Sequence, residues 1–99
     1  MATVDGNTID TRYKNYISEE DYQDIWRDAW NKVAGEFDYP NGYTASWDYN
    51  SITIFEDDTE EEHADVTEVQ IAALEEQLAS EFETKIFEMC EYYLHNKAE

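Results

Sequence analysis

The chain has 99 residues, of which 25 are Asp or Glu and six are Lys or Arg, and its formal net charge at pH 7 is −19. A charge of this size repels nucleic acid and anionic membrane surfaces, which argues against both as direct partners and favours a basic protein surface. The length suits a single domain spanning residues 1–99, and 41% apolar and 15% aromatic residues can form a hydrophobic core, unlike a disordered acidic tail.

The first 17 residues, MATVDGNTIDTRYKNYI, leave two alternatives open. The Asp-Gly pair within VDGNT is typical of a tight hairpin turn. Ile9, Thr11 and Tyr13 alternate along the chain as the residues on one face of a strand do. The segment is therefore either a short hairpin or an irregular arm.

The spacing of apolar residues predicts a helix over about 18–36. Ser18 followed by Asp21 resembles a capping box, and three acids in the first turn favour the positive helix start. Gly35 is expected to end the helix. The apolar face consists of Tyr22, Ile25, Trp26, Ala29, Val33 and Phe37.

A turn and two strands are predicted next. DYPNGY, which contains the single proline Pro40, is typical of a turn. In the first strand Tyr43, Ala45 and Trp47 alternate, and DYNS supplies the turn to the second strand. The second strand carries apolar groups on both faces, in SITIFED, so we expect it to be covered on both sides.

A long C-terminal helix is predicted over about 66–96. Either Asp65 with Glu68 or Thr67 with Gln70 can cap it. At ~1.5 Å per residue it is ~45 Å long, so it must span the whole molecule or protrude from it. Its apolar stripe consists of Ile71, Leu74, Leu78, Phe82, Ile86, Met89 and Tyr93. The predicted fold class is α+β, with a small antiparallel sheet packed against the two helices.

The second half of this helix is apolar on more than one face. Phe87 and Leu94 point away from the main stripe, and Cys90 lies between. One interpretation is a helix end buried between two layers. The other is a helix that also makes a homodimer contact.

The sequence gives little support for a metal, catalytic or cofactor site. No segment has the glycine and glutamate positions of a calcium-binding EF-hand loop. Cys90, His63 and His95 are too far apart to indicate a zinc site, and no catalytic triad or glycine-rich phosphate loop is recognisable. We expect a non-enzymatic protein without cofactor or metal.

The cysteine content and the absence of targeting signals indicate a cytoplasmic protein. With Cys90 as the one cysteine, no intramolecular disulfide can form. The N-terminus does not resemble a signal peptide, and no apolar run approaches the ~20 residues of a transmembrane helix.

The acids are arranged in rows and clusters. Glu20, Asp24 and Asp28 follow one another at one-turn steps of ~6 Å, similar to the spacing of phosphates on a DNA strand, which carries a charge per ~3.4 Å of axis. The segment from Glu56 to Asp65 contains seven acids in ten residues. On the C-terminal helix, glutamates flank the apolar stripe on both sides, and few lysines accompany them. The candidate partner-binding residues are Glu20, Asp24, Asp28, Glu56, Asp57, Asp58, Glu60, Glu61, Glu62, Asp65, Glu76, Glu83 and Glu91.

In length, charge and scarcity of lysine, the chain resembles the small acidic proteins of phages and mobile elements that mimic DNA, such as anti-restriction and anti-CRISPR proteins. These proteins share no sequence motif, so no residue role is carried over. The resemblance implies an inhibitor, located in the host cytoplasm if a phage encodes it, whose carboxylates occupy the basic groove of a nucleic-acid-binding protein. The aromatic residues beyond the apolar faces are available as interface anchors: Trp30, Tyr39, Tyr43, Tyr49 and Tyr92. Two alternatives stay open: an acidic adaptor or assembly factor for a basic protein, and a halophilic domain whose charge serves solubility alone.

Overall fold

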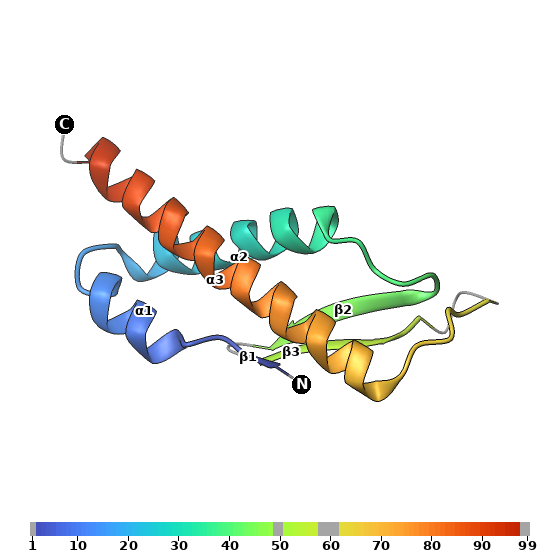
Figure 1. Ribbon diagram of the computed structural model, residues 1–99. Coiled ribbons are helices and arrows are strands. Elements are labelled where there is room, and N and C mark those ends of the chain that lie inside the picture. The colour runs from blue at the N-terminus through green and yellow to red at the C-terminus, as the bar shows by residue number, and fades with distance from the viewer. Residues whose placement is uncertain (1, 49–50, 58–61, 98–99) are drawn as a thin grey trace.

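A computed structural model describes residues 2–48, 51–57 and 62–97, and it confirms the α+β class (Figure 1). In chain order the described elements are β1 (Ala2–Thr3), α1 (Gly6–Tyr13), α2 (Glu19–Glu36), β2 (Tyr43–Asp48), β3 (Ser51–Glu56) and α3 (Glu68–Lys97). The sheet is antiparallel with strand order β1-β3-β2. The long helix α3 runs past the sheet with its first half and past α1 and α2 with its second half (Figure 1).

Residues 6–13 form a helix, so the strand-like hairpin and the irregular arm predicted for residues 1–17 are both wrong here. The side chain of Asp5 caps α1 by accepting from the Thr8 amide at 3.2 Å and from the Thr8 hydroxyl at 2.7 Å. Ile9 and Tyr13 are four residues apart, so in a helix they share a face, and both are buried. Thr11, which a strand would place beside them, is exposed.

Helix α2 begins and ends close to its predicted bounds. The Ser18 hydroxyl accepts from the Asp21 amide at 3.3 Å, which confirms the predicted cap. Gly35 does not end the helix, because Glu36 is still helical and the extended backbone begins at Phe37. The predicted apolar face is buried or packed against the core.

Helix α3 is confirmed over Glu68–Lys97. Of the two capping alternatives, the one with Thr67 and Gln70 is formed. The Thr67 hydroxyl accepts from the Gln70 amide at 3.1 Å, and the Gln70 side chain accepts from the Thr67 amide at 2.8 Å. The molecule measures 50 × 21 × 17 Å, so α3, at ~1.5 Å per residue, spans nearly the whole long axis.

The β2–β3 hairpin covers the core with one face. Ile52 and Ile54 are buried, whereas Phe55 on the other face is 43% exposed, so the prediction that β3 is covered on both sides is wrong. The predicted turn between these strands includes positions 49 and 50, which lie outside the described residues.

The predicted turn at DYPNGY is confirmed and requires a glycine. Gly42 has a φ of 82°, and a Cβ atom there would lie 2.4 Å from the Glu62 carbonyl oxygen. The Asn41 carbonyl accepts from the Ala64 amide at 2.7 Å, and the Gly42 carbonyl accepts from the Asp57 amide at 2.8 Å. These two hydrogen bonds join the turn to both described ends of the segment 57–67, which we call the acidic connector between β3 and α3.

The second half of α3 lies between α1 and α2. This agrees with the interpretation of its apolar faces as a helix end buried between two layers. On one flank the ring of Phe87 packs edge-on against Tyr13 of α1, with centroids 5.7 Å apart. On the other, the Tyr93 hydroxyl donates to Asp21 of α2 at 2.6 Å. Cys90, between them, is fully buried.

Candidate functional site

The acidic row on α2 faces solvent. Its buried residues lie on the opposite side of the helix, so the row Glu20–Asp24–Asp28 is turned away from the core. Glu20 and Asp28 are exposed. Asp24 is half-buried and forms an ion pair with Arg27 at 2.5 Å, which offsets part of its charge. The row is therefore held at one-turn spacing, with its two outer members carrying most of the uncompensated charge.

The predicted row on α3 is divided between two places. Glu76 and Glu83 lie near β1, where they line a shallow hollow of about 390 Å³ with Ala2 and Thr3. Glu91, about two turns beyond Glu83, faces α1 instead. The structure therefore groups Glu76 with Glu83 and separates Glu91 from them.

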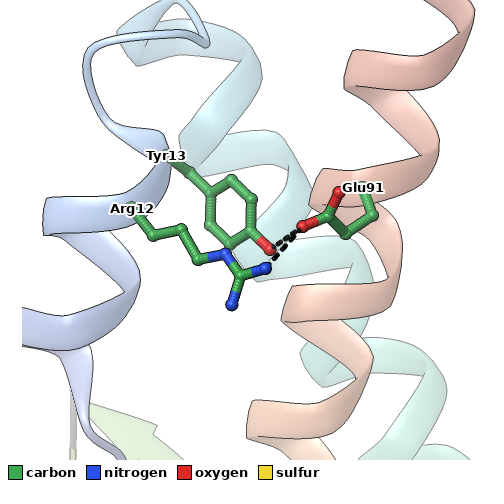
Figure 2. Close-up of polar contacts among 3 residues, drawn as sticks. All are labelled: Arg12, Tyr13 and Glu91. Atoms are coloured by element: carbon green, nitrogen blue, oxygen red, sulfur yellow. Dashed lines mark hydrogen bonds and ion pairs between the residues drawn. The ribbon is translucent and has the colours of Figure 1, made fainter.

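Glu91 holds α1 against α3 (Figure 2). One of its carboxylate oxygens accepts from the Tyr13 hydroxyl at 2.6 Å and from the Arg12 guanidinium at 3.2 Å. The guanidinium carbon also lies 5.6 Å from the centre of the Phe87 ring. Burial raises the pKa of Tyr13 to about 12, with smaller contributions from the hydrogen bond and charge of Glu91. These contacts assign Glu91 a structural role, which the helical spacing alone does not reveal.

The acidic connector is described only at its two ends. Asp58, Glu60 and Glu61 lie outside the described residues. The remaining members of the cluster, Glu56, Asp57, Glu62 and Asp65, lie near the end of the sheet around the Gly42 turn. Glu56, Glu62 and Asp65 are exposed, and Asp57 is half-buried.

The described candidate residues surround the molecule and do not share one face. At ~100° per residue, Glu76 and Glu83 lie roughly opposite Lys85 and Met89, the α3 residues that meet α2. The body of α3 therefore separates this pair from the α2 row. The structure presents negative charge on several sides of an elongated body.

Few cations offset this charge. The ion pairs among the described residues include Arg12–Glu91, Arg27–Asp24 and Lys85–Glu88. The sequence places Lys85 one turn after Glu81, but its ammonium lies 3.7 Å from Glu88 instead. Exposed carboxylates such as Glu20, Asp28 and Glu76 belong to none of these pairs.

Glu75 is a polar residue of the core that the sequence patterns miss. Its side chain is 3% exposed, and its carboxylate accepts from the Ile54 amide at 2.8 Å. The strand register leaves Ile54 beyond the two residues of β1, so Glu75 takes the place of a neighbouring strand. In the sequence, its position between Ile71 and Leu78 on the apolar stripe is the one indication that Glu75 is buried.

Most of the aromatic residues expected to be interface anchors contribute to the core. Trp30 packs against Phe82, with ring centroids 5.4 Å apart, and Tyr39 packs against Phe37 at 5.1 Å. Tyr43 is half-buried, and Tyr49 lies outside the described residues. Tyr92 is different, because it is 72% exposed on the second half of α3.

The described residues contain no group of three or more His, Cys, Asp or Glu side chains placed to hold a metal ion. Nor does any helix in that part of the chain combine the length and apolar character needed to cross a bilayer. Comparison of the sequence with protein-family models and curated proteins, and of the fold with solved structures, gives no significant match.

Proposed function

We propose that this protein is a non-enzymatic inhibitor that presents its carboxylates to the basic groove of a nucleic-acid-binding protein and thereby excludes nucleic acid. The observation that carries the proposal is the outward-facing row on α2, where Glu20 and Asp28 are exposed and held by a helix packed firmly on the core. A row fixed in this way meets a basic groove without the entropy cost of ordering a flexible acidic tail.

The shape of the molecule and its charge density support the same proposal. The described residues include 21 of the 25 acids and all six bases, which leaves 15 net negative charges. Along the long axis of 50 Å, this is one net charge per about 3.3 Å. One DNA strand carries one charge per ~3.4 Å of axis, and the duplex carries twice that density.

The mechanism we infer is electrostatic capture followed by exclusion. A cleft lined with Lys and Arg focuses its positive potential and accelerates the approach of a polyanion. The carboxylates of the α2 row then form ion pairs with the groove and occupy the positions that phosphates take in the nucleic-acid complex. Binding therefore weakens as salt rises, in parallel with counterion screening.

Matched charge variants test the proposal. Glu20→Gln with Asp28→Asn and Glu76→Gln with Glu83→Gln both change the net charge from −19 to −17, but on different flanks of the molecule. Asp24 is left intact because its removal would free Arg27. Each protein is titrated against fluorescent DNA duplexes bound to purified restriction enzymes, CRISPR effectors and other basic DNA-binding proteins, with polyglutamate at equal charge as the control.

We expect the wild-type protein to displace DNA from at least one of these proteins at concentrations where polyglutamate does not. The α2 variant should be weaker by about tenfold, because loss of two interfacial ion pairs removes about 1.4 kcal/mol. The Glu76/Glu83 variant should change less. Displacement no better than polyglutamate contradicts the proposal, and binding without displacement supports the adaptor alternative.

A further inference from the structure

A second feature lies where α2 and α3 pack side by side. The two helices run antiparallel, since Tyr93 near the end of α3 bonds Asp21 at the start of α2. Between them is an apolar hollow of about 740 Å³, lined by Ile25, Glu88, Met89, Tyr92, Tyr93 and Asn96. Its size falls within the ~300–1,000 Å³ of ligand-binding pockets.

The same helix pair forms an acidic hollow next to the apolar one. This second hollow, of about 390 Å³, is lined by three glutamates, Glu36, Glu81 and Glu88, and by one cation, Lys85. Val33 and Phe37 of α2 form part of its wall. Glu88 lines both hollows, so the two are adjacent along the helix pair, and we call them together the α2–α3 groove, with an apolar end and an acidic end.

We propose that the α2–α3 groove binds a helical segment of the basic partner, with apolar side chains in the apolar end and Lys or Arg side chains at the acidic end. A groove between two packed helices suits a third, amphipathic helix, which inserts anchors at i, i+3, i+4 and i+7. Tyr92 is the anchor offered by this protein, because Tyr combines a large apolar ring with a polar tip and is favoured in interfaces.

Charge decides between a basic segment and a second copy of this chain. Two copies would bring together molecules of net charge −19 and place the glutamates of each groove near those of the other. Such like-charge contacts oppose association. A segment with Lys and Arg beside its apolar face meets the opposite sign at Glu36 and Glu81, whereas Glu88 is already paired with Lys85.

The inference deepens the proposed function, because it adds an anchoring contact to the electrostatic one. The apolar contact gives the protein affinity that DNA lacks and that salt does not screen. The groove is therefore the element that discriminates among basic partners, while the acidic rows speed the encounter.

A designed peptide tests the groove directly. The probe is an 18-residue labelled peptide with leucines at helical spacing in its first half and lysines and arginines in its second half. A scrambled peptide of the same composition and charge is the control. Binding is measured by fluorescence anisotropy in 150 mM salt with wild-type protein and with Tyr92→Ala, Tyr16→Ala, Glu81→Gln and Glu76→Gln.

Tyr16 is the matched control for Tyr92, because the two side chains are 67% and 72% exposed and their removal spares the core. We expect the patterned peptide to bind at least tenfold more tightly than the scrambled one. Tyr92→Ala should lose at least tenfold and Tyr16→Ala less than twofold. Glu81→Gln should weaken binding more than Glu76→Gln, which removes the same charge outside the groove. Circular dichroism checks that every variant is folded.

Equal binding of both peptides, or equal effects of Tyr92→Ala and Tyr16→Ala, would overturn the inference. So would a dimer, seen by sedimentation at micromolar concentration, that Tyr92→Ala dissociates, because a second copy would then occupy the groove. Failure of the proposed function looks different: the peptide would bind through the groove while DNA is not displaced from any basic protein.

Discussion

At the scale of single residues, two glutamates of α3 show how contacts within the molecule give a carboxylate a structural role. Glu75 and Glu91 belong to a helix with many exposed acids, yet each makes contacts that hold the fold together. Glu75 satisfies a strand amide inside the core, where an unpaired N–H would be costly. Glu91 joins two helices through one carboxylate oxygen. Burial keeps the Glu75 charge from a partner, whereas the Glu91 side chain is 55% exposed and its charge is shared with Tyr13 and Arg12.

Substitution of Glu75 tests this role. Glu75→Ala removes the acceptor of the buried Ile54 amide and should lower the free energy of unfolding by about 1–3 kcal/mol. Glu75→Gln keeps an acceptor oxygen on a side chain of nearly the same shape and should lose less. Urea denaturation measures both, and Glu76→Gln, an exposed neighbour, is the control. If the Ala and Gln variants unfold at the same urea concentration as the wild type, the hydrogen bond does not contribute to stability.

At the scale of elements, α1 depends on its contacts with the rest of the molecule. It has eight residues, too few for a stable isolated helix, which needs more than ~12. The Asp5 cap and the burial of Ile9 and Tyr13 supply the stability that its sequence lacks. The Tyr13–Glu91 hydrogen bond then holds the end of α1 on α3.

The Tyr13 hydroxyl makes this contact sensitive to alkaline pH. Its pKa is raised from 10.0 to about 12 in the folded protein, mainly by burial. A raised pKa means that the contribution to stability is complete below pH ~10, the value for an unfolded Tyr, and is lost as pH rises through about 12. Burial likewise raises the pKa of Cys90 to about 12, so part of the alkaline loss begins near pH ~8.5, where an unfolded thiol ionises.

Tyr13→Phe separates these contributions. The variant should lose about 1 kcal/mol of unfolding free energy at pH 7, because it lacks the hydroxyl that Glu91 accepts from. Between pH ~10 and 12 its stability should fall less steeply than that of wild type, since one titrating group is gone. Guanidinium denaturation at a series of pH values gives both quantities, with Tyr16→Phe as the exposed control. Parallel pH profiles would show that Tyr13 does not carry the effect.

At the scale of the whole molecule, net charge opposes folding and helps partner capture. The net charge of −19 means that the carboxylates of this chain repel one another. The extended α3 spreads them along the long axis, and the core built on Leu78, Phe82 and Ile86 outweighs the remaining repulsion. The same field attracts a basic protein from a distance.

Salt is therefore expected to stabilise the fold. The melting temperature should rise with NaCl and level off near 1 M, where the Debye length is only ~3 Å and screening is complete. Glu20→Gln with Asp28→Asn should melt higher than wild type in low salt and equally in high salt, as differential scanning calorimetry can show. A melting temperature that keeps rising well above 1 M would instead favour the halophilic alternative.

Much of the fold follows from local sequence patterns. The helices over about 18–36 and 66–96, the hairpin and the glycine turn are set by apolar periodicity, capping residues and turn chemistry within each segment. The net charge and the spacing of the acidic rows likewise follow from the sequence, because the helical period determines which acids lie one turn apart.

Tertiary structure decided the features that depend on contacts between residues far apart in the sequence. Helix α1 forms from residues with weak helix propensity because Ile9 and Tyr13 join the core, and because Asp10 and Tyr13 contact Tyr22 of α2 and Phe87 of α3. Tertiary packing also set which face of β3 is buried, which glutamates bond inside the molecule, and where α2 and α3 leave a groove. Periodicity within a segment specifies which residues share a face, whereas only packing between segments determines what that face meets.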